Sequence, residues 1–208
     1  MNRLQLRSSA PDPAIVARAA DVLRSGGVVA YPTDTLYGLA ADPRREDAIE
    51  RLFQVKRRDP GMAVPLIAAD VEQAGMAGEL GARELRLARA FWPGPLSIVI
   101  PARAPLAKRA LGDGTTVAIR VPAHAVARAL AAAFGFCITA TSANVSGAGA
   151  PATADGLSED VEARVDLMLD AGPAPGGEPS TLVAFDEGGP VLIRAGAIAW
   201  ERVLKSLE

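Results

Sequence analysis

The apolar residues of the chain follow two spacings, one typical of helices and one typical of buried strands. Apolar positions three and four residues apart predict amphipathic helices, whereas short apolar, β-branched runs bounded by turn residues predict strands. The first spacing predicts helices over residues 13–25, 46–56, 82–92, 123–133 and 200–207. The second predicts strands over residues 28–31, 64–68, 96–100, 115–121, 136–140, 165–169 and 181–185, with a further apolar run at 191–193.

The order of these elements predicts the fold class. Strands and helices alternate along the chain, which is typical of an α/β domain. Strands joined through a helix favour parallel pairing, and the closely spaced strands near the C-terminus favour antiparallel pairing. Because no long linker divides the chain, we expect one domain over residues 1–208 with its core at about 13–200. Its architecture should be a twisted mixed parallel/antiparallel sheet flanked by helices.

Composition narrows the class of protein further. Half of the 208 residues are hydrophobic and 22% are charged, which is typical of a globular protein without disorder. No apolar run reaches the length of a membrane span, and the first residues lack a secretory signal. We therefore expect a cytoplasmic protein without membrane contact, and the single cysteine, Cys137, agrees with a reducing compartment. The formal charge of −2 means that any nucleic-acid contact must use a local basic surface.

The single histidine and single cysteine limit the chemistry. One of each cannot build the usual Cys/His zinc site, and Cys137 lies in an apolar run. His124 stands at the start of a predicted helix, where we interpret it as structural rather than as a general base. A serine hydrolase that pairs Ser142 with His124 is an alternative, but no GxSxG elbow surrounds the serine. Any chemistry of this chain should therefore depend on hydroxyl groups, backbone groups and fixed cations.

Polar clusters follow several of the apolar runs. Pro32 should end the first strand, because it lacks a backbone donor, and Thr33, Asp34 and Thr35 follow it directly. The other clusters are Lys56-Arg57-Arg58, Thr141-Ser142-Ala143-Asn144, and Ser180-Thr181 with Arg194 beyond. Ligands of open α/β sheets bind at strand ends, and hydroxyls, lysine and arginine donate hydrogen bonds to phosphates and carboxylates. The pattern predicts a site for a ligand that carries both groups.

Each cluster also has a structural interpretation. A turn of threonine and aspartate can cap the next segment, and a basic run can be a solvated helix end. Arg120, which lies in the apolar half of a predicted strand, can meet either an anionic ligand or an internal carboxylate. Neither a GxxxxGK[ST] loop nor a GxGxxG motif that opens a helix is present. The residues alone therefore do not name a reaction.

Seven segments of the chain, in family order, resemble the YrdC-like family of L-threonylcarbamoyl-AMP synthases. They are PTDTLYGLAAD (32–42), KRR (56–58), WPGPLS (92–97), VAIRVP (117–122), TSANVSG (141–147), STLV (180–183) and LIRAG (192–196). Together they span nearly the whole chain. The resemblance implies a twisted mixed sheet with flanking helices. Since the sequence stops at 208, we expect the single-domain branch of the family.

The resemblance also implies an activity. Family members join L-threonine, bicarbonate or CO2, and ATP with Mg2+ to give threonylcarbamoyl-AMP and pyrophosphate. A partner threonylcarbamoyl transferase then modifies an adenosine next to the tRNA anticodon. By motif, the L-threonine site would contain Thr35, Arg120, Ala140 and Ser180. The ATP site would contain Lys56, Arg58, Thr116, Ser142, Asn144 and Arg194, with Lys56 and Arg58 as the catalytic cations.

The chain departs from the family pattern at three places, and the first of them keeps a second interpretation open. Asp59 stands where the family usually has a proline, and Pro65-Leu66 comes about one residue late. The place of a histidine found in some members is taken by about Ala69. The alternative is a paralogue without synthase activity that binds RNA or nucleotides. Its contact with double-stranded RNA or tRNA would use a basic patch made of Lys56, Arg57, Arg58, Arg83, Arg86 and Arg89.

Overall fold

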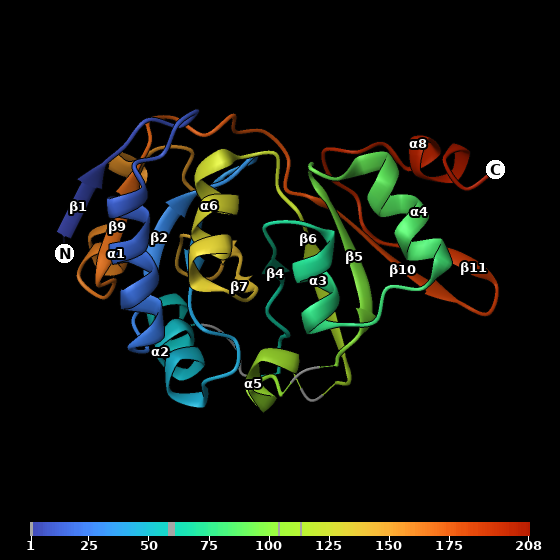
Figure 1. Cartoon of the computed structure of the whole chain (residues 1–208), viewed down its shortest axis with the longest axis horizontal. Coiled ribbons are helices and arrows are strands. Elements are labelled where there is room, and N and C mark those ends of the chain that lie inside the picture. The colour runs from blue at the N-terminus through green and yellow to red at the C-terminus, as the bar shows by residue number, and fades with distance from the viewer. Residues whose placement is uncertain (1, 58–60, 104, 113) are drawn as a thin grey trace.

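The strands form two hydrogen-bonded sheets rather than the single sheet expected from the sequence (Figure 1). The computed structural model describes residues 2–57, 61–103, 105–112 and 114–208. The first sheet has the strand order β1 (Asn2–Gln5), β9 (Leu167–Asp170), β2 (Val29–Pro32), β3 (Tyr37–Ala40) and β8 (Thr141–Ser142). The second has the order β11 (Gly189–Arg194), β10 (Thr181–Asp186), β5 (Leu96–Pro101), β6 (Thr116–Arg120), β4 (Leu66–Ile67) and β7 (Ile138–Thr139).

Both sheets are mixed, which confirms the α/β class and the mixed pairing. In the first sheet β9 pairs in parallel with β1 and β2, while β3 is antiparallel to β2 and β8. In the second sheet β5 pairs in parallel with β10, and β4 with β6. The remaining pairs, β5–β6, β4–β7 and the β10–β11 hairpin, are antiparallel.

The chain passes from one sheet to the other at Ala140. The sequence predicted one strand over 136–140, but β7 ends at Thr139 and pairs with β4, whereas β8 begins at Thr141 and pairs with β3. The side chain of Thr139 ties the sheets together, because its Oγ1 accepts the N–H of Ala41 at 2.8 Å and donates to the carbonyl of Leu39 at 3.0 Å. Tyr31 Oη donates to the carbonyl of Thr139 at 3.0 Å.

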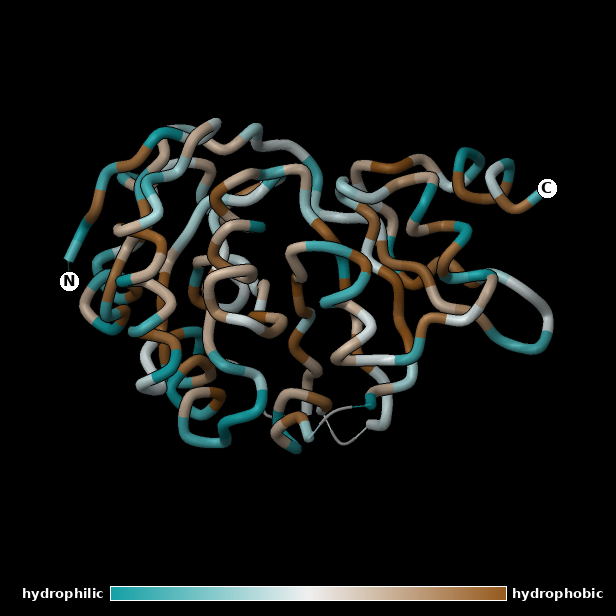
Figure 2. Tube along the Cα trace, viewed as in Figure 1, coloured by the Kyte–Doolittle hydropathy of each residue, from teal (hydrophilic) through white to brown (hydrophobic). Residues whose placement is uncertain are grey.

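Helices cover both sheets. Helices α1 (Pro13–Arg24) and α6 (Ala125–Phe134) pack against each other and against β2, and α2 (Glu46–Lys56) packs with the short helices α5 (Lys108–Leu111) and α7 (Glu159–Glu162). Helix α3 (Val71–Ala77) contacts β6, and α4 (Ala82–Phe91) contacts β5. The last helix, α8 (Trp200–Lys205), closes the described chain. Figure 2 shows that the central strands are largely apolar.

The alternating side chains of β2 serve two hydrophobic clusters. Val29 and Tyr31 belong to the cluster under α1 and α6, which continues into the second sheet. Val28, which directly precedes β2, and Ala30 belong to the cluster under α2. Successive side chains of a strand point to opposite faces of the sheet, so β2 is buried on both faces. This explains its uninterrupted apolar sequence.

The sequence missed mainly short elements. The periodicity did not predict β1, β3, α3, α5, α7 or the 3₁₀ turn at Ala154–Gly156. These segments are too short to repeat an apolar spacing. The strand β3 matters most for function, because it carries the chain back from the polar turn that follows Pro32. In the described residues, no helix has the length and apolar character needed to cross a membrane.

Candidate active site between the two sheets

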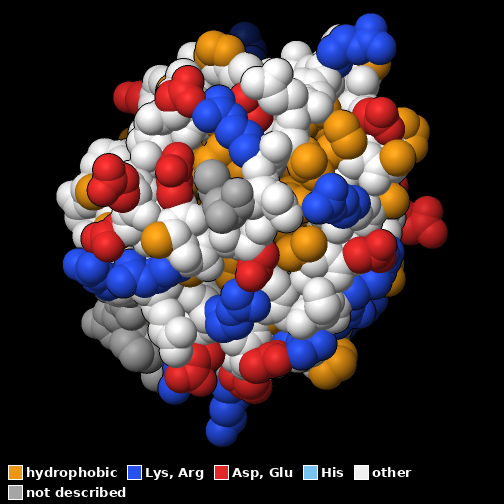
Figure 3. Space-filling view, turned by 90° about the vertical axis from the view of Figure 1, so that its left-hand side faces the viewer, with side chains coloured by type: hydrophobic (Ala, Val, Ile, Leu, Met, Phe, Trp, Pro, Cys, Tyr) orange, Lys and Arg blue, Asp and Glu red, His pale blue; other side chains and the backbone are white. Residues whose placement is uncertain are grey.

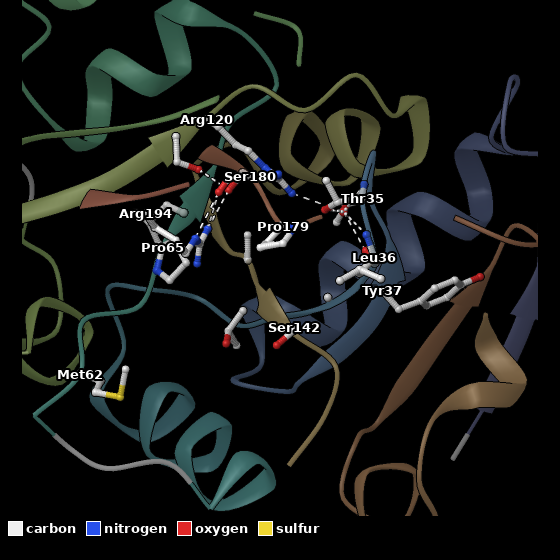
Figure 4. Close-up of a pocket in the computed structure, with 16 residues that line it drawn as sticks. Thr35, Leu36, Tyr37, Met62, Pro65, Arg120, Ser142, Pro179, Ser180 and Arg194 are labelled. Atoms are coloured by element: carbon white, nitrogen blue, oxygen red, sulfur yellow. Dashed lines mark hydrogen bonds between the residues drawn. The ribbon is translucent and has the colours of Figure 1, made fainter. Parts of the chain in front are cut away.

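A cavity of about 250 Å³ lies where the two sheets meet (Figure 4). Its wall combines hydroxyl groups and two guanidinium groups with apolar side chains from Leu36, Met62, Pro65 and Pro179. The polar lining residues are Thr33, Thr35, Ser97, Arg120, Thr141, Ser142, Ser180 and Arg194. They come from strand ends and turns of both sheets, so the site exists only when the two sheets are docked.

Thr33 organises the turn between β2 and β3. Its Oγ1 donates to the carbonyl of Leu36 at 2.7 Å and accepts the N–H groups of Thr35 and Leu36. It also lies 3.1 Å from Thr35 Oγ1. Thr33 and Thr35 are buried, with 3% and 6% of their surface exposed. A hydroxyl that satisfies several backbone groups fixes a turn, so Thr35 is held at the cavity wall.

Arg120 enters the cavity from the end of β6. Its guanidinium Nη2 lies 3.3 Å from Asp34 Oδ1 and donates to Thr33 Oγ1, also at 3.3 Å. The other oxygen of Asp34 accepts the N–H of Ala123 at 3.0 Å. Arg120 therefore has the internal carboxylate that the structural interpretation required. It also lines the cavity, so the internal ion pair does not conflict with the ligand interpretation, which stays a prediction.

Arg194 reaches the cavity from the end of β11. Its Nη2 donates to the carbonyl of Ser180 at 2.7 Å and to Ser180 Oγ at 3.1 Å, and its Nε donates to the same carbonyl at 3.2 Å. Ser180 Oγ in turn lies 2.9 Å from Ser97 Oγ. The three residues form a continuous polar chain along one wall.

The cavity has an excess of positive charge. Arg120 is balanced by Asp34, but within the described chain no carboxylate forms an ion pair with Arg194. Burial, together with the charge of Arg120, lowers the pKa of Arg194. Its guanidinium stays charged at neutral pH because the ordinary pKa is so high. An anion in the cavity would relieve both the desolvation and the repulsion, so the geometry favours an anionic ligand.

Lys56, at the end of α2, lies behind the cavity rather than in its wall. The residue is 3% exposed, and its Nζ donates to the carbonyl groups of Ser142 and Asn144, the latter at 2.8 Å. Ser146 N–H donates back to the carbonyl of Lys56 at 2.8 Å. Asn144 Nδ2 donates to the carbonyl groups of Val145 and Ala148. These bonds hold the loop that presents Ser142 to the cavity.

The predicted site residues fall into three groups. Thr35, Arg120, Ala140, Ser142, Ser180 and Arg194 line the one cavity. Lys56 and Asn144 contact it through the Ser142 loop. Thr116 lies at the exposed start of β6, roughly 13 Å along the strand from Arg120 at the usual rise per residue, and does not line the cavity. Arg58 and Asp59 lie outside the described residues.

Three serine and threonine residues of the lining were not assigned to a substrate by motif, although Thr33 and Thr141 belong to the polar clusters seen in the sequence. Thr33, Ser97 and Thr141 have hydroxyl groups and line the cavity. The signal was present, because each stands inside a segment that carried the resemblance: PTDT, WPGPLS and TSAN. Trp92 positions the second of these segments, since its Nε1 donates to the carbonyl of Leu96 at 2.7 Å.

Comparison with known proteins decides the family. A family model described as telomere recombination, of the Sua5, YciO and YrdC proteins, matches residues 21–196. The chain belongs to the Sua5/YciO/YrdC family. Relatives include the threonylcarbamoyl-AMP synthase of Bacillus subtilis (strain 168), which is 36% identical over 197 residues. That alignment covers 94% of this chain and 57% of the relative. The same-named protein of Methylococcus capsulatus is 45% identical over 130 residues, or 62% of this chain and 70% of that one.

Solved family structures agree with this assignment. The structure of Pyrococcus abyssi Sua5 complexed with L-threonine aligns with a TM-score of 0.93 at 33% identity. The alignment covers 99% of this chain and 61% of Sua5. Escherichia coli YciO shares the fold, with a TM-score of 0.85 at 24% identity. The chain spans little more than half the length of the first curated relatives, 57% and 55% of them.

The basic patch considered for RNA binding is not one surface. Figure 1 places α2 and α4 at opposite sides of the molecule, which separates Lys56 and Arg57 from the α4 arginines. Arg57 pairs with Asp160 at 3.0 Å, and the Arg83 guanidinium lies 4.8 Å from the centre of the Phe185 ring. On the face shown in Figure 3, basic and acidic side chains are interspersed. The described members of the patch therefore lie on two separate parts of the molecule, and an RNA contact stays a prediction.

The serine hydrolase arrangement is absent from the described residues. No hydrogen bond joins Ser142 to His124 in this part of the chain. His124 lies instead beside Asp34, and burial lowers its pKa while the Asp34 carboxylate opposes that shift. Cys137 is buried, and burial raises the pKa of its thiol to about 12. Neither side chain is a reactive group of the cavity.

Proposed function

We propose that this protein is an L-threonylcarbamoyl-AMP synthase of the cytoplasm. It would convert L-threonine, bicarbonate or CO2, and ATP into threonylcarbamoyl-AMP and pyrophosphate. The observation that carries the proposal is the cavity whose wall holds Arg120 and Arg194 on either side of Ser180 (Figure 4). Two cations along one hydroxyl-rich wall suit a reaction between a carboxylate substrate and a nucleotide. The name of the relatives and the L-threonine complex of Sua5 support it.

The L-threonine subsite would contain Thr35, Arg120, Ala140 and Ser180. Arg120 would bind the substrate carboxylate. Asp34 and Thr33 contact only its Nη2, so the other N–H groups of the guanidinium can donate to a ligand. Thr35 offers a hydroxyl from the turn that Thr33 fixes. Ala140, at the junction of the sheets, would contribute its backbone and a small side chain.

The ATP subsite would contain Arg194, Ser142 and Asn144, with Lys56, Arg58 and Thr116 assigned by motif. Arg194 is the described cation of the cavity without a carboxylate partner, which suits a phosphate. Ser142 lines the cavity, and Lys56 supports its loop. A catalytic role of Lys56 would require it to act through that loop or to exchange its present acceptors for phosphate oxygens. Thr116 would need a ligand that extends well beyond the described cavity.

The chemistry needs no protein nucleophile. The neutral amino group of L-threonine first adds to the carbon of CO2 and loses a proton to solvent, which gives a carbamate. A carbamate oxygen then attacks the α-phosphorus of ATP, the bond to the β-phosphate oxygen breaks, and pyrophosphate leaves with that electron pair. Fixed cations at the phosphates stabilise the developing negative charge. This division of labour suits a site of hydroxyls and guanidinium groups.

Mg2+ would enter as the complex of ATP. The described residues contain no group of three or more histidine, cysteine or acidic side chains placed to hold a metal ion. Magnesium is commonly held by substrate phosphates, water and one or two carboxylates. Mg2+ would therefore belong to the ATP complex rather than to a metal site of the protein. The product would pass to a threonylcarbamoyl transferase that modifies tRNA.

Pyrophosphate release tests the proposal directly. Purified protein with ATP and Mg2+ should release pyrophosphate only when both L-threonine and bicarbonate are present, and Arg58→Ala should abolish the release. Release without either addition would indicate a simple nucleotide hydrolase. No release, together with salt-dependent tRNA binding that needs no nucleotide, would favour the RNA-binding paralogue.

A further inference from the structure

The hydroxyl groups of Ser97 and Ser180 form a pair inside the cavity. Ser97 lies in β5, and Ser180 directly precedes β10, which pairs in parallel with β5. Their Oγ atoms are 2.9 Å apart, and only 3% and 7% of the two residues are exposed. Both residues line the cavity, so the pair is part of its wall.

The hydrogen bonds around this pair leave one proton without an acceptor. Each serine has one hydroxyl proton, and their mutual hydrogen bond uses one of the two. Ser180 Oγ also accepts from Arg194 Nη2 at 3.1 Å, but a guanidinium donates only and cannot take the second proton. Among the described residues, neither Oγ has a further acceptor within hydrogen-bond distance. The remaining proton therefore needs an acceptor in the cavity itself.

The position of the pair indicates what that acceptor is. Figure 4 shows Ser180 between Arg120 and Arg194, whose charges favour an anion at this place. An anionic oxygen that meets these guanidinium groups also accepts a hydroxyl hydrogen bond, and such charge-assisted bonds are stronger than neutral ones.

We propose that Ser97 and Ser180 act as one donor unit, which supplies a single hydrogen bond to an anionic oxygen of the ligand. Ser97 thereby becomes a ligand-binding residue of the site. The identity of the ligand rests on the proposed function. Its acceptor is a carboxylate or phosphate oxygen, a chemistry that L-threonine and ATP share, so the two ligands are tested separately.

The proton count makes a specific prediction for variants. Without Ser97, the hydroxyl of Ser180 still accepts from Arg194 and directs its own proton to the ligand. Without Ser180, the hydroxyl of Ser97 has lost its partner and directs its proton to the ligand instead. Each single variant keeps one donor, and only the double variant has none. The losses of affinity are therefore not additive.

Calorimetric titration of the full chain with L-threonine alone and with ATP alone tests this prediction. Ser97→Ala and Ser180→Ala should each raise the Kd of one ligand by about two- to threefold. The double variant should raise the same Kd by about 10- to 150-fold, the range expected for a lost hydrogen bond to a charged group. The ligand that shows the excess supplies the acceptor oxygen.

A buried hydroxyl outside the cavity provides the matched control. Thr181 Oγ1 donates to the carbonyl of Ile198 at 2.7 Å and accepts the N–H of Ile198 at 2.9 Å, so its proton has an internal acceptor. The double variant Ser97→Ala/Thr181→Val should change each Kd only slightly. Its fold-change should equal the product of the fold-changes of the two single variants. Thermal melting of every variant confirms that the protein is folded.

The outcomes separate this proposal from the proposed function. Suppose that the wild-type protein binds both ligands and that the fold-change in Kd of the double variant equals the product of the two single fold-changes. The donor unit is then overturned, and the synthase proposal stays intact. Wild-type protein that binds neither L-threonine nor ATP overturns both. An excess in the double variant, absent from the Thr181 control, supports the pair.

Discussion

Arg120 Nη2 lies 3.3 Å from Asp34 Oδ1, and both side chains are more than nine-tenths buried. Asp34 belongs to the turn after β2, and Arg120 is the last residue of β6, so the ion pair joins the two sheets. Asp34 also accepts the N–H of Ala123 next to α6. One carboxylate thus fixes the cavity arginine and the start of a helix.

Asp34→Asn should destabilise the protein through Arg120. Asparagine keeps an acceptor for Ala123 N–H but removes the negative charge, which leaves a buried guanidinium without compensation. Removing one partner of a buried ion pair costs up to about 3–5 kcal/mol, and water in the cavity should reduce that cost here. Urea unfolding measures the loss, and a saturating anionic ligand should restore part of it.

Asp47→Asn is the control for that change. Asp47 pairs with Arg45 at 2.5 Å, but its side chain is 64% exposed. Solvent screens such a pair, so the free energy of unfolding should change far less. Equal losses in the two variants would contradict the role assigned to burial at Asp34.

His124 should make stability depend on pH in a window below neutrality. Burial lowers its pKa from the ordinary 6.5, with Asp34 as the opposing charge, so the unfolded chain takes up the proton first. The free energy of unfolding should therefore fall as the pH decreases from about 6.5 towards the folded-state pKa. This is the only histidine, so few other groups titrate between pH 5 and 7.

The matched variant is His124→Gln, which cannot titrate. Urea unfolding of wild type and variant at pH 5.0 to 7.5 should give a slope in the wild type that the variant lacks. An equal slope in both proteins would show that another group is responsible.

Local chemistry explains which parts of the site were predictable. Pro32 ends β2 as expected, because the missing N–H is a property of that residue alone. The polar turn was visible because Thr33, Asp34 and Thr35 directly follow an apolar run, and Thr33 and Thr35 do line the cavity. Arg120 was recognisable because a guanidinium in an apolar strand needs a partner. The sequence left open whether that partner is internal, because Asp34 lies 86 residues earlier in the chain.

The rest depended on contacts between distant segments. The division into two sheets follows from the different partners of Thr139 and Thr141, which no run of apolar residues encodes. The sequence could not show that Lys56 donates to the Ser142 loop, because its carbonyl acceptors lie 86 and 88 residues later in the chain. Thr116 is near Arg120 in sequence, but an extended strand carries it away from the cavity.

Gly196→Ala should disturb the site through backbone contact. A Cβ at Gly196 would meet the carbonyl of Pro179, and would lie 2.7 Å from both Ser180 C and Thr181 N. These backbone atoms cannot rotate away, so the start of β10 and Ser180 must move. Such overpacking costs about 1–3 kcal/mol. We expect a lower melting temperature and weaker ligand binding together.

Gly75→Ala is the matched glycine variant. Gly75 lies inside α3, and a Cβ there would meet nothing within 4 Å. Replacing a glycine by alanine within a helix stabilises by about 0.5–1 kcal/mol. The two substitutions should therefore shift the melting temperature in opposite directions. A destabilised Gly75→Ala would contradict the open space at that position.

Arg120→Ala and Arg194→Ala should divide the two substrates between them. If Arg120 holds the carboxylate of L-threonine and Arg194 holds a phosphate of ATP, each variant should raise one Kd by about 10- to 150-fold, as for a lost charged hydrogen bond. The Kd of the other ligand should rise much less. Titration of each variant with each ligand measures this, with Arg202→Ala, whose guanidinium lies 5.9 Å from the centre of the Phe91 ring, as an arginine control. Equal losses of both affinities in Arg120→Ala would mean that one arginine serves both ligands, since the two guanidinium groups already share the wall at Ser180.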